Sequence, residues 1–439
     1  MLTGKLCRTY PEMKDSKTLW LGDIPNHWKT IRIGYVSEVI DPQPDHRAPT
    51  LSEGSGFPYV GIRDLNSDGT VNIETARKVE ESAIIKQECN FTIEYGDIVF
   101  CKVGTLGFPR HIKPISRIAL SATLVLIKSK LINNRFLCYA LDSNATYGQI
   151  TYLSTGSTRA ALGIEQIRRF KISLPTISEQ QAIADFLDRK TALIDSIIAR
   201  KERLIQVLKE KRQAVITKTV TKGLDPNVEM DDSGVVWIGE KPKSWKTSCI
   251  KFSTEIIRGK FSFRPRNDPS LYDGVYPFIQ TGDVSNVDKY ITEYKQTLNE
   301  KGYNVSKKFP SGTLVMTIAA NVGDIAILTF DACFPDSIVG FTPNSNTDVN
   351  YLYYLFIALR PELMSTAIIN TQLNLNIERI GTLKSVFPPL LEQNKIADYL
   401  NKFDLSINRI VEFTGKQISK LKEYRQSLVF AAVTGKIKV

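Results

Sequence analysis

The chain lacks long apolar runs and paired cysteines, and each absence excludes a class of protein. The longest strongly apolar run, 351–359, is about half of the roughly 20 residues that a membrane-spanning helix needs. The first 20 residues have no apolar core typical of a secretion signal. The six cysteines form no Cys-x-x-Cys pair, which disfavours a zinc ribbon or a disulfide framework. We therefore expect a cytoplasmic protein with reduced thiols and no membrane partner.

Motifs for catalysis and metal binding are also missing. The phosphate-binding Gly-x-x-x-x-Gly-Lys-Ser/Thr loop is absent, and the sole Pro-Pro, in Phe387-Pro-Pro-Leu390, lacks the flanking residues of an amino-methyltransferase loop. No convincing cluster of carboxylates indicates a magnesium nuclease. The three histidines, His27, His46 and His111, lack the spacing of metal ligands. We expect no catalytic activity, no cofactor and no metal in this chain.

Length and charge indicate a multidomain protein with a polyanionic partner. At 439 residues the chain exceeds the roughly 250–300 residues that one hydrophobic core serves. Its hydrophobic content of 42% and charged content of 23% are typical of globular proteins. The net charge of +11 favours a partner such as nucleic acid.

The chain contains an internal repeat, which the four tryptophans reveal first. The segment Trp20-Leu-Gly-Asp-Ile-Pro-Asn-His-Trp28 matches Trp237-Ile-Gly-Glu-Lys-Pro-Lys-Ser-Trp245 at an offset of 217 residues. Further on, Gly96-Asp-Ile-Val99 matches Gly312-Thr-Leu-Val315 at an offset of 216, and Leu106-Gly107 matches Val322-Gly323. Blocks in the same order with a nearly constant offset indicate a duplicated module.

The last matching block is the strongest. Glu179-Gln180 and Ile183-Ala-Asp-Phe-Leu187 recur as Glu392-Gln393 and Ile396-Ala-Asp-Tyr-Leu400, now at an offset of 213. The shrinking offset indicates two copies of about 200 residues that differ by small deletions.

The first part of each copy has the pattern of a mixed α/β domain. Short apolar runs at 58–62, 98–103 and 122–127 alternate with Gly and Pro, which is typical of strands. A helical pattern follows at Asn134–Leu141 and, in the second copy, at Asn350–Ile357.

Each copy ends in a segment of about 40 residues without proline and with little glycine, which predicts a long helix. Ser178-Glu-Gln180 is the expected N-terminal cap of the first one. We therefore predict a first globular domain over residues 1–175, a central helix over 176–222, a second globular domain over 223–388 and a C-terminal helix over 389–439.

Both predicted helices carry an apolar stripe with alternating spacing of three and four residues, which is typical of paired helices. The apolar positions expected to pair are Ile183, Leu187, Ile194, Ile197, Leu204, Leu208 and Val215 in the first helix, and Ile396, Leu400, Phe403, Ile407, Ile410, Leu421, Tyr424 and Leu428 in the second. We expect the helices to pair antiparallel as a coiled coil, with a pseudo-two-fold repeat. The alternative is that each stripe packs only on its own domain.

Two similar basic domains linked by a rod of about 60 Å would read two short DNA sequences across an unread gap. Divergence between the copies allows the two half-sites to differ. In this order, the repeated Trp-x-Gly-x-x-Pro-x-x-Trp segment, the Gly-Asp-Ile/Gly-Thr-Leu blocks and the Pro-x-x-x-Glu-Gln helices resemble the specificity subunit of type I restriction-modification systems.

That resemblance implies a fold, a function and partners. The fold would be two mixed α/β target-recognition domains separated by two packed antiparallel helices. The function would be recognition of a bipartite, asymmetric site in double-stranded DNA. The partners would be two methyltransferase subunits and endonuclease subunits that translocate DNA, so the chemistry would belong to other chains.

Residue type suggests which side chains contact DNA, because Arg, Asn and Gln pair with base edges, whereas Lys, Ser and Thr commonly bind phosphates. The candidates are Arg63, Lys102, Arg110, Lys113, Arg117, Ser157, Thr158 and Arg159 in the first copy, and Arg258, Lys260, Arg264, Arg266, Lys307, Lys308, Thr371, Gln372 and Asn374 in the second. Two other functions stay open: a nuclease or methyltransferase that acts alone, and a coiled-coil scaffold without a DNA role.

Overall fold

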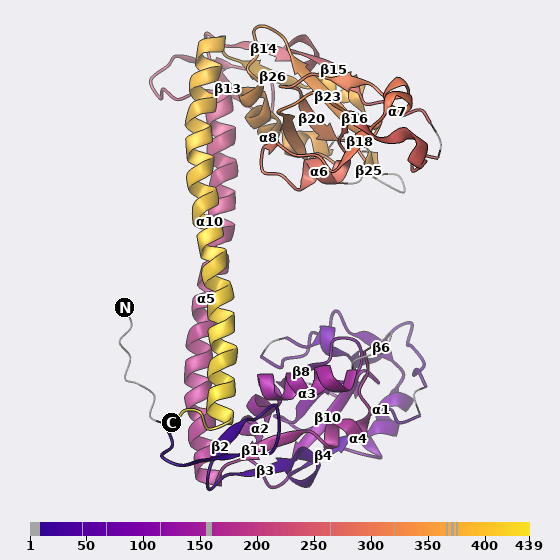
Figure 1. Ribbon diagram of the computed structural model, residues 1–439, viewed down its shortest axis with the longest axis vertical. Coiled ribbons are helices and arrows are strands. Elements are labelled where there is room, and N and C mark those ends of the chain that lie inside the picture. The colour runs from indigo at the N-terminus through magenta and orange to yellow at the C-terminus, as the bar shows by residue number, and fades with distance from the viewer. Residues whose placement is uncertain are drawn as a thin grey trace. The chain divides into compact units, whose positions relative to one another are not determined.

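The computed structural model describes residues 9–45, 47–66, 68–114, 116–154, 160–263, 265–319, 321–365, 368–369, 373–374 and 376–439. The chain forms two compact units (Figure 1). Unit 1 comprises residues 1–201 and 416–439, and unit 2 comprises residues 202–415. Each unit takes part of both long helices, because the boundaries between the units fall within those helices.

Unit 1 is built on a four-stranded antiparallel sheet in the order β4-β10-β7-β8 and a three-stranded sheet in the order β6-β5-β9. Two smaller ladders pair β1 with β2 and β3 with β11. The strands are β1 (Met13–Asp15), β2 (Asp23–Pro25), β3 (Lys29–Arg32), β4 (Ser37–Ile40), β5 (Phe57–Val60), β6 (Arg77–Val79), β7 (Ile98–Cys101), β8 (Gly107–His111), β9 (Ala119–Leu120), β10 (Leu124–Ser129) and β11 (Lys171–Leu174).

The core of unit 1 lies between these two sheets. Val99 of β7, Leu126 of β10 and Val60 of β5 pack in one buried cluster. On the other face of β7, Phe100 contacts Phe170, with ring centroids 6.0 Å apart. Because β7 is buried on both faces, its sequence is a continuous apolar run instead of an alternating one.

The helices of unit 1 lie around the sheets. They are η1 (Ile33–Tyr35), η2 (Ile62–Asp64), α1 (Glu81–Glu88), α2 (Asn134–Leu141), α3 (Asn144–Ser154) and α4 (Ile164–Arg168), followed by the first long helix, α5 (Ile177–Lys222). Thr176 and Glu179 cap α5, because the carboxylate of Glu179 accepts the backbone N–H of Thr176 at 3.0 Å. The expected cap at Ser178 was wrong, since Ser178 already lies inside the helix.

Unit 2 repeats this plan with larger sheets. A five-stranded sheet has the order β15-β23-β20-β21-β17, a four-stranded sheet has the order β18-β16-β22-β19, and three two-stranded ladders complete the set. The strands are β12 (Met230–Asp232), β13 (Glu240–Pro242), β14 (Lys246–Cys249), β15 (Thr254–Arg258), β16 (Tyr272–Phe278), β17 (Tyr290–Ile291), β18 (Gln296–Leu298), β19 (Lys308–Phe309), β20 (Leu314–Thr317), β21 (Ile325–Leu328), β22 (Ala332–Cys333), β23 (Ile338–Pro343), β24 (Ile368–Ile369), β25 (Leu373–Asn374) and β26 (Lys384–Phe387).

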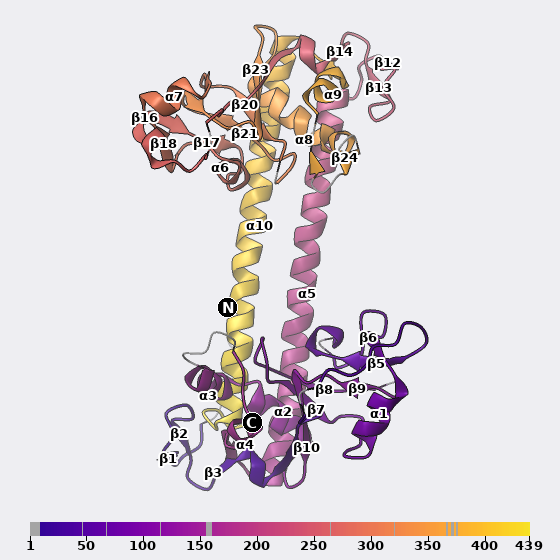
Figure 2. The same cartoon turned by 90° about the vertical axis from the view of Figure 1, so that its right-hand side faces the viewer.

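The core of unit 2 joins the five-stranded sheet to the long helices through α8 (Val349–Ser365; Figure 2). Ile216 and Val220 of α5 and Leu400 of the second long helix pack in one cluster with Tyr351 of α8. The hydroxyl of Tyr351 also donates to the carbonyl of Val220 at 3.1 Å. The helices are η3 (Ile250–Phe252), η4 (Pro269–Leu271), α6 (Thr281–Ser285), α7 (Glu300–Asn304), α8 (Val349–Ser365), α9 (Ile377–Thr382) and α10 (Leu390–Val433).

The two long helices, α5 and α10, lie side by side in both units (Figures 1 and 2). In unit 1, Lys201 contacts Gln417 and Asp195 contacts Arg425. Partner numbers on α10 rise as those on α5 fall, so the helices run antiparallel. In unit 2, Arg212 pairs with Asp404, while Gly223, just after α5, lies beside Glu392 near the start of α10. Mixed α/β parts and paired long helices confirm the predicted fold class.

Candidate nucleic-acid interface

The repeated tryptophan and Glu-Gln motifs meet at the start of each long helix. The indole N–H of Trp28 donates to Glu179 at 3.2 Å, and that of Trp245 donates to Glu392 at 3.0 Å. The glutamine that follows each glutamate accepts a backbone N–H at the start of a domain helix, α2 in unit 1 and α8 in unit 2. These contacts explain why distant blocks repeat together: they fix each domain on its helix.

The glutamine contacts also correct the alignment of the copies. Gln180 accepts from the N–H of Asn133, and Gln393 accepts from the N–H of Asp348. Asn133 and Asp348 also cap their helices in the same way, each accepting a backbone N–H three residues later. The offset here is therefore 215, and the pairing of Asn134 with Asn350 was one residue out.

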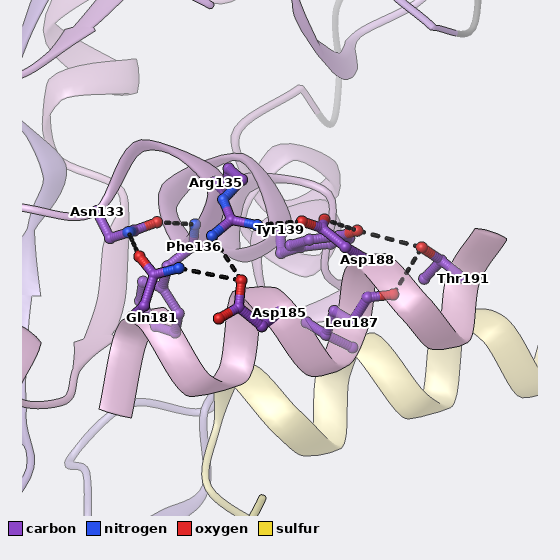
Figure 3. A network of polar contacts seen from close by, with 9 residues as sticks. All are labelled: Asn133, Arg135, Phe136, Tyr139, Gln181, Asp185, Leu187, Asp188 and Thr191. Carbon is purple, nitrogen blue, oxygen red and sulfur yellow. Dashed lines mark hydrogen bonds and ion pairs between the residues drawn. The ribbon is translucent and has the colours of Figure 1, made fainter. Parts of the chain in front are cut away.

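In unit 1 a network of ion pairs joins α2 to α5 (Figure 3). The guanidinium of Arg135 binds Asp185 at 2.7 Å and also contacts Asp188. The hydroxyl of Tyr139 donates to Asp188 at 2.8 Å and lies 3.1 Å from the hydroxyl of Thr191. Charged groups thus orient the first domain on its helix.

Unit 2 uses a lysine and an amide at the equivalent place. Asn401, which corresponds to Asp188, accepts from the ammonium of Lys289 at 2.5 Å and from the hydroxyl of Tyr354 at 2.9 Å. The ammonium also lies 4.6 Å from the ring centroid of Tyr354 and 5.0 Å from that of Tyr353. Burial lowers the pKa of Lys289 to about 8, although Asp404 and Asp348 nearby oppose this shift.

The inward-facing row of each long helix lies partly one residue away from the predicted stripe. Ile183, Leu187 and Ile194 in α5 are buried, as are Ile396, Leu400, Ile407 and Leu428 in α10. Ile197, Leu208, Val215, Phe403 and Leu421 are half-buried. Leu204, Ile410 and Tyr424 were wrongly included in the buried stripe, because they are 44%, 46% and 56% exposed.

Polar residues between the two helices explain this shift. They include Arg212, whose guanidinium donates twice to Asp404 at 2.8 and 2.6 Å, and Arg425, which donates to Asp195 at 3.0 Å. The predicted stripe instead contained Tyr424, the residue before Arg425, because the stripe was chosen from apolar side chains. Arg212 and Arg425 are equivalent in the repeat, so both units place an arginine between the helices.

The basic candidates of unit 1 fall into two groups. Lys102 is 4% exposed and its ammonium binds Asp41 at 2.5 Å, so it was wrong as a DNA contact. Arg117 is exposed, but Glu81 and Glu88 both bind its guanidinium at 2.7 and 2.6 Å, which neutralises its charge.

Three further basic candidates of unit 1 lie in the described part of the chain and are exposed to solvent to different degrees. Arg63 is exposed, and no ion pair or hydrogen bond joins its side chain to another residue in the described part of the chain. Arg110 is half-buried beside Phe108, and Lys113 is half-buried.

The basic candidates of unit 2 lie on the surface. Arg258 donates to the backbone carbonyl of Asp336 at 2.6 Å, and Arg266 forms an ion pair with the carboxylate of the same residue. Lys308 pairs with Asp331 at 2.8 Å, and Lys260 and Lys307 are exposed. Ser157, Thr158, Arg159, Arg264, Thr371 and Gln372 lie outside the described residues, and Asn374 lies in β25, opposite Ile368.

An open cavity of about 460 Å³ lies beside Arg266 in unit 2. Its walls combine aromatic rings and amides, which the sequence analysis did not single out. The lining residues are Phe261, Arg266, Asn267, Tyr272, Phe278, Gln280, Thr281, Gln296, Ala319, Pro335 and Ser337. The side chain of Gln280 donates to that of Gln296 at 2.6 Å. Amides and an arginine grouped at an open surface are the groups that read base edges in DNA.

No described helix combines the length and apolarity required to cross a bilayer. Among the residues that the structure describes, no three His, Cys, Asp or Glu side chains gather as metal ligands would.

Comparison with known proteins identifies the family. The model of the type I restriction modification DNA specificity domain matches twice, over residues 25–207 and 242–420. The chain belongs to this family, whose members are DNA sequence-specificity subunits of type I restriction-modification systems.

Two curated relatives from Escherichia coli match nearly the whole chain. The type I restriction enzyme EcoDI specificity subunit is 23% identical over 95% of this chain and 90% of its own. The EcoBI specificity subunit is 22% identical over 98% and 90%. A solved structure from a study of the assembly and conformational transition of the type I R-M system covers 93% of this chain and 98% of its own, with a TM-score of 0.70 and 18% identity, and so shares the fold.

Proposed function

We propose that this specificity subunit reads a bipartite, asymmetric sequence in double-stranded DNA, one half with each unit. The main support is that the two units share their elements but differ in their exposed polar side chains. Unit 1 presents Arg63, whereas unit 2 presents Gln280 beside the ion pair of Arg266 with Asp336. Different donors and acceptors select different bases, so the two half-sites differ.

The subunit does not itself modify or cut DNA. It docks two methyltransferase subunits, and endonuclease subunits that translocate DNA complete the assembly. The docking surface includes apolar side chains that the helix pairing leaves exposed. On α10 these include Ile410 and Phe413, which are 46% and 63% exposed, and on α5 they include Leu204. Exposed apolar groups on a helix are typical of a partner surface when they form a patch.

The test is to express this chain with the methyltransferase subunit of its own operon and to map methylated adenines across the host genome. We expect one asymmetric motif with two specified halves and an unspecified gap. Random methylation, or a palindromic motif, would contradict the proposal. Exchanging residues 1–175 for those of a related subunit should alter only one half of the motif.

The purified chain without added subunits is the matched control. Incubated with duplex DNA and either Mg²⁺ or S-adenosylmethionine, it should leave the DNA uncut and unmethylated. Cleavage or methylation by this preparation would favour an enzyme that acts alone. If the complete complex bound DNA with no dependence on salt, a scaffold role would be favoured, because phosphate contacts make affinity fall steeply with salt.

A further inference from the structure

The two units share one turn that is capped in the same way and carries different side chains. It follows β5 in unit 1 and β16 in unit 2, the strands that pair in parallel with β9 and β22. The backbone N–H of Gly61 donates to the carboxylate of Asp64 at 2.8 Å. The N–H of Gln280 donates to that of Asp283 at 2.9 Å. Position 61 therefore corresponds to 280, and position 63 corresponds to 282.

In each copy, one of these two positions carries a long polar side chain and the other is glycine, and the order is reversed between the copies. Unit 1 has Gly61 and Arg63, and unit 2 has Gln280 and Gly282. Neither glycine is required by the backbone, since neither has a positive φ. A Cβ atom added at Gly61 would meet its nearest atom at 3.6 Å, and one at Gly282 at 4.0 Å, which is ordinary contact. The turn thus accepts different side chains without cost to the fold.

In unit 2 the side chain on this turn is held in one orientation. Gln280 lies at the rim of the cavity and is exposed, and its amide donates to Gln296 of β18 at 2.6 Å. That contact uses one of its two N–H donors, and a primary amide has a second donor and a carbonyl acceptor. A donor and an acceptor side by side match N7 and the N6 amino group of adenine.

In unit 1 the same turn presents a guanidinium. The side chain of Arg63 is exposed, and no carboxylate pairs with it within the described part of the chain. The side chains of Arg117 and Lys102, in contrast, are both paired with carboxylates. A guanidinium with free N–H groups matches O6 and N7 of guanine.

We propose that this turn carries a base-reading side chain in each unit: Gln280, oriented by Gln296, reads adenine in one half-site, and Arg63 reads guanine in the other. This inference rests on the proposed bipartite recognition and names residues that carry it. The two glycines leave room for the reading side chain at either of two positions on the same turn. Changes at one turn would then alter specificity while the surrounding fold is kept.

The experiment uses the complex of the full chain with its methyltransferase subunit. The wild-type motif is mapped first, and competition between duplexes with single-base changes measures discrimination at each position. Four variants follow: Gln280→Ala, Gln296→Leu, Arg63→Ala and, as a phosphate-contact control, Lys307→Ala. Thermal unfolding of each variant shows whether it remains folded.

We expect Gln280→Ala to lose roughly 10- to 100-fold discrimination at one A·T pair, with the other half-site unchanged. Gln296→Leu should relax the same position. Arg63→Ala should relax one G·C pair in the opposite half-site. Lys307→Ala should weaken binding to all sequences equally.

Three results would overturn the inference. In the first, a folded Gln280→Ala complex keeps the wild-type motif. In the second, it loses affinity for all duplexes equally, as a phosphate contact would. In the third, the Gln280 and Arg63 variants change the same half-site. A wild-type complex without any bipartite motif is a separate result, because it would contradict the proposed function itself.

Discussion

The two units bind their long helices with the same geometry but with different chemistry. In unit 1, Arg135 bridges Asp185 and Asp188 between α2 and α5. In unit 2, the equivalent of Asp188 is Asn401, and a half-buried lysine, Lys289, from another part of the domain contacts it. The tyrosine on the domain helix is retained in both, as Tyr139 and Tyr354. Duplication therefore preserved where the domain meets the helix, and the polar groups that fill the contact diverged.

The surfaces of the two units differ in the same manner. Unit 2 has an open cavity lined by aromatic rings and amides, and the turn of unit 1 at the equivalent place carries Gly61 and Arg63. A fixed scaffold with variable polar side chains suits a protein whose two halves read different sequences. Four predictions test whether equivalent residues have equivalent roles in the two units.

The largest effect is expected from equivalent isoleucines in the helix pair. Ile194 and Ile407 are 5% and 6% exposed, whereas Ile410 is 46% exposed and Ile197 is half-buried. Ile→Ala at 194 or 407 should lower the free energy of unfolding by about 3 kcal/mol, because each leaves a cavity. Urea unfolding monitored by circular dichroism would measure this.

The matched controls are Ile410→Ala and Ile197→Ala. At 410 the loss should stay below about 1 kcal/mol, since a solvent-exposed side chain contributes little packing. An equal loss of stability at 407 and 410 would contradict the structure. It would mean that Ile410 packs between the helices, as the apolar stripe predicted from the sequence had it.

An intermediate effect on stability is expected when acid protonates Glu179, which joins Trp28 to the start of α5 in unit 1. Burial alone would raise the pKa of Glu179, but hydrogen bonds from His27, Thr176 and Trp28 outweigh it and lower the pKa to about 2. Because this pKa lies below the unfolded value of about 4.5, the carboxylate stabilises the fold above pH 4.5. That contribution is lost as pH falls from 4.5 toward 2.

Glu179→Gln tests this linkage. Above pH 5 the variant should be less stable than wild type by about 2 kcal/mol, and the difference should close toward pH 2. Unfolding curves recorded at pH 2.5, 3.5, 4.5 and 6 would measure the gap. A constant gap over this range would contradict the pKa assigned to Glu179.

The smallest effect is expected from exchanging the contact residues between the units. Asp188→Asn gives unit 1 the amide of unit 2 and should cost about 1 kcal/mol at low salt, because these ion pairs are more than a third exposed. The loss should shrink in 0.5 M NaCl, since salt already screens the wild-type pair. Unfolding in both salt concentrations would measure it.

The reverse exchange is Asn401→Asp, which places a carboxylate 2.5 Å from the ammonium of Lys289. In wild type the pKa of Lys289 is about 8, below its ordinary value, so stability should rise as pH increases from 8 toward 10.5. The new carboxylate should raise this pKa and reduce that rise. An unchanged pH profile between 7 and 10 would show that Lys289 does not contact residue 401 in solution.

Much of the fold was predictable because its signals are local or rare. Four tryptophans in two matched pairs revealed the duplication, and 40 residues without proline predicted each long helix. The candidate interface was less predictable. Lys102 and Asp41 are 61 residues apart in sequence, and no local pattern indicates that folding would bury them as a pair.

The sequence by itself determined the two copies, the mixed α/β domains and the two long helices. Each of these features has a signal that can be read within a short segment, either a hydrophobic periodicity or a motif that occurs twice. Only the tertiary structure decided which polar groups face inward. Arg212 and Asp404 occupy the helix seam where an apolar stripe was expected, because the two hydrogen bonds of this half-buried ion pair satisfy both charges. The cavity of unit 2 likewise exists only after folding, when Arg266, Gln280 and Gln296 come together from separate segments.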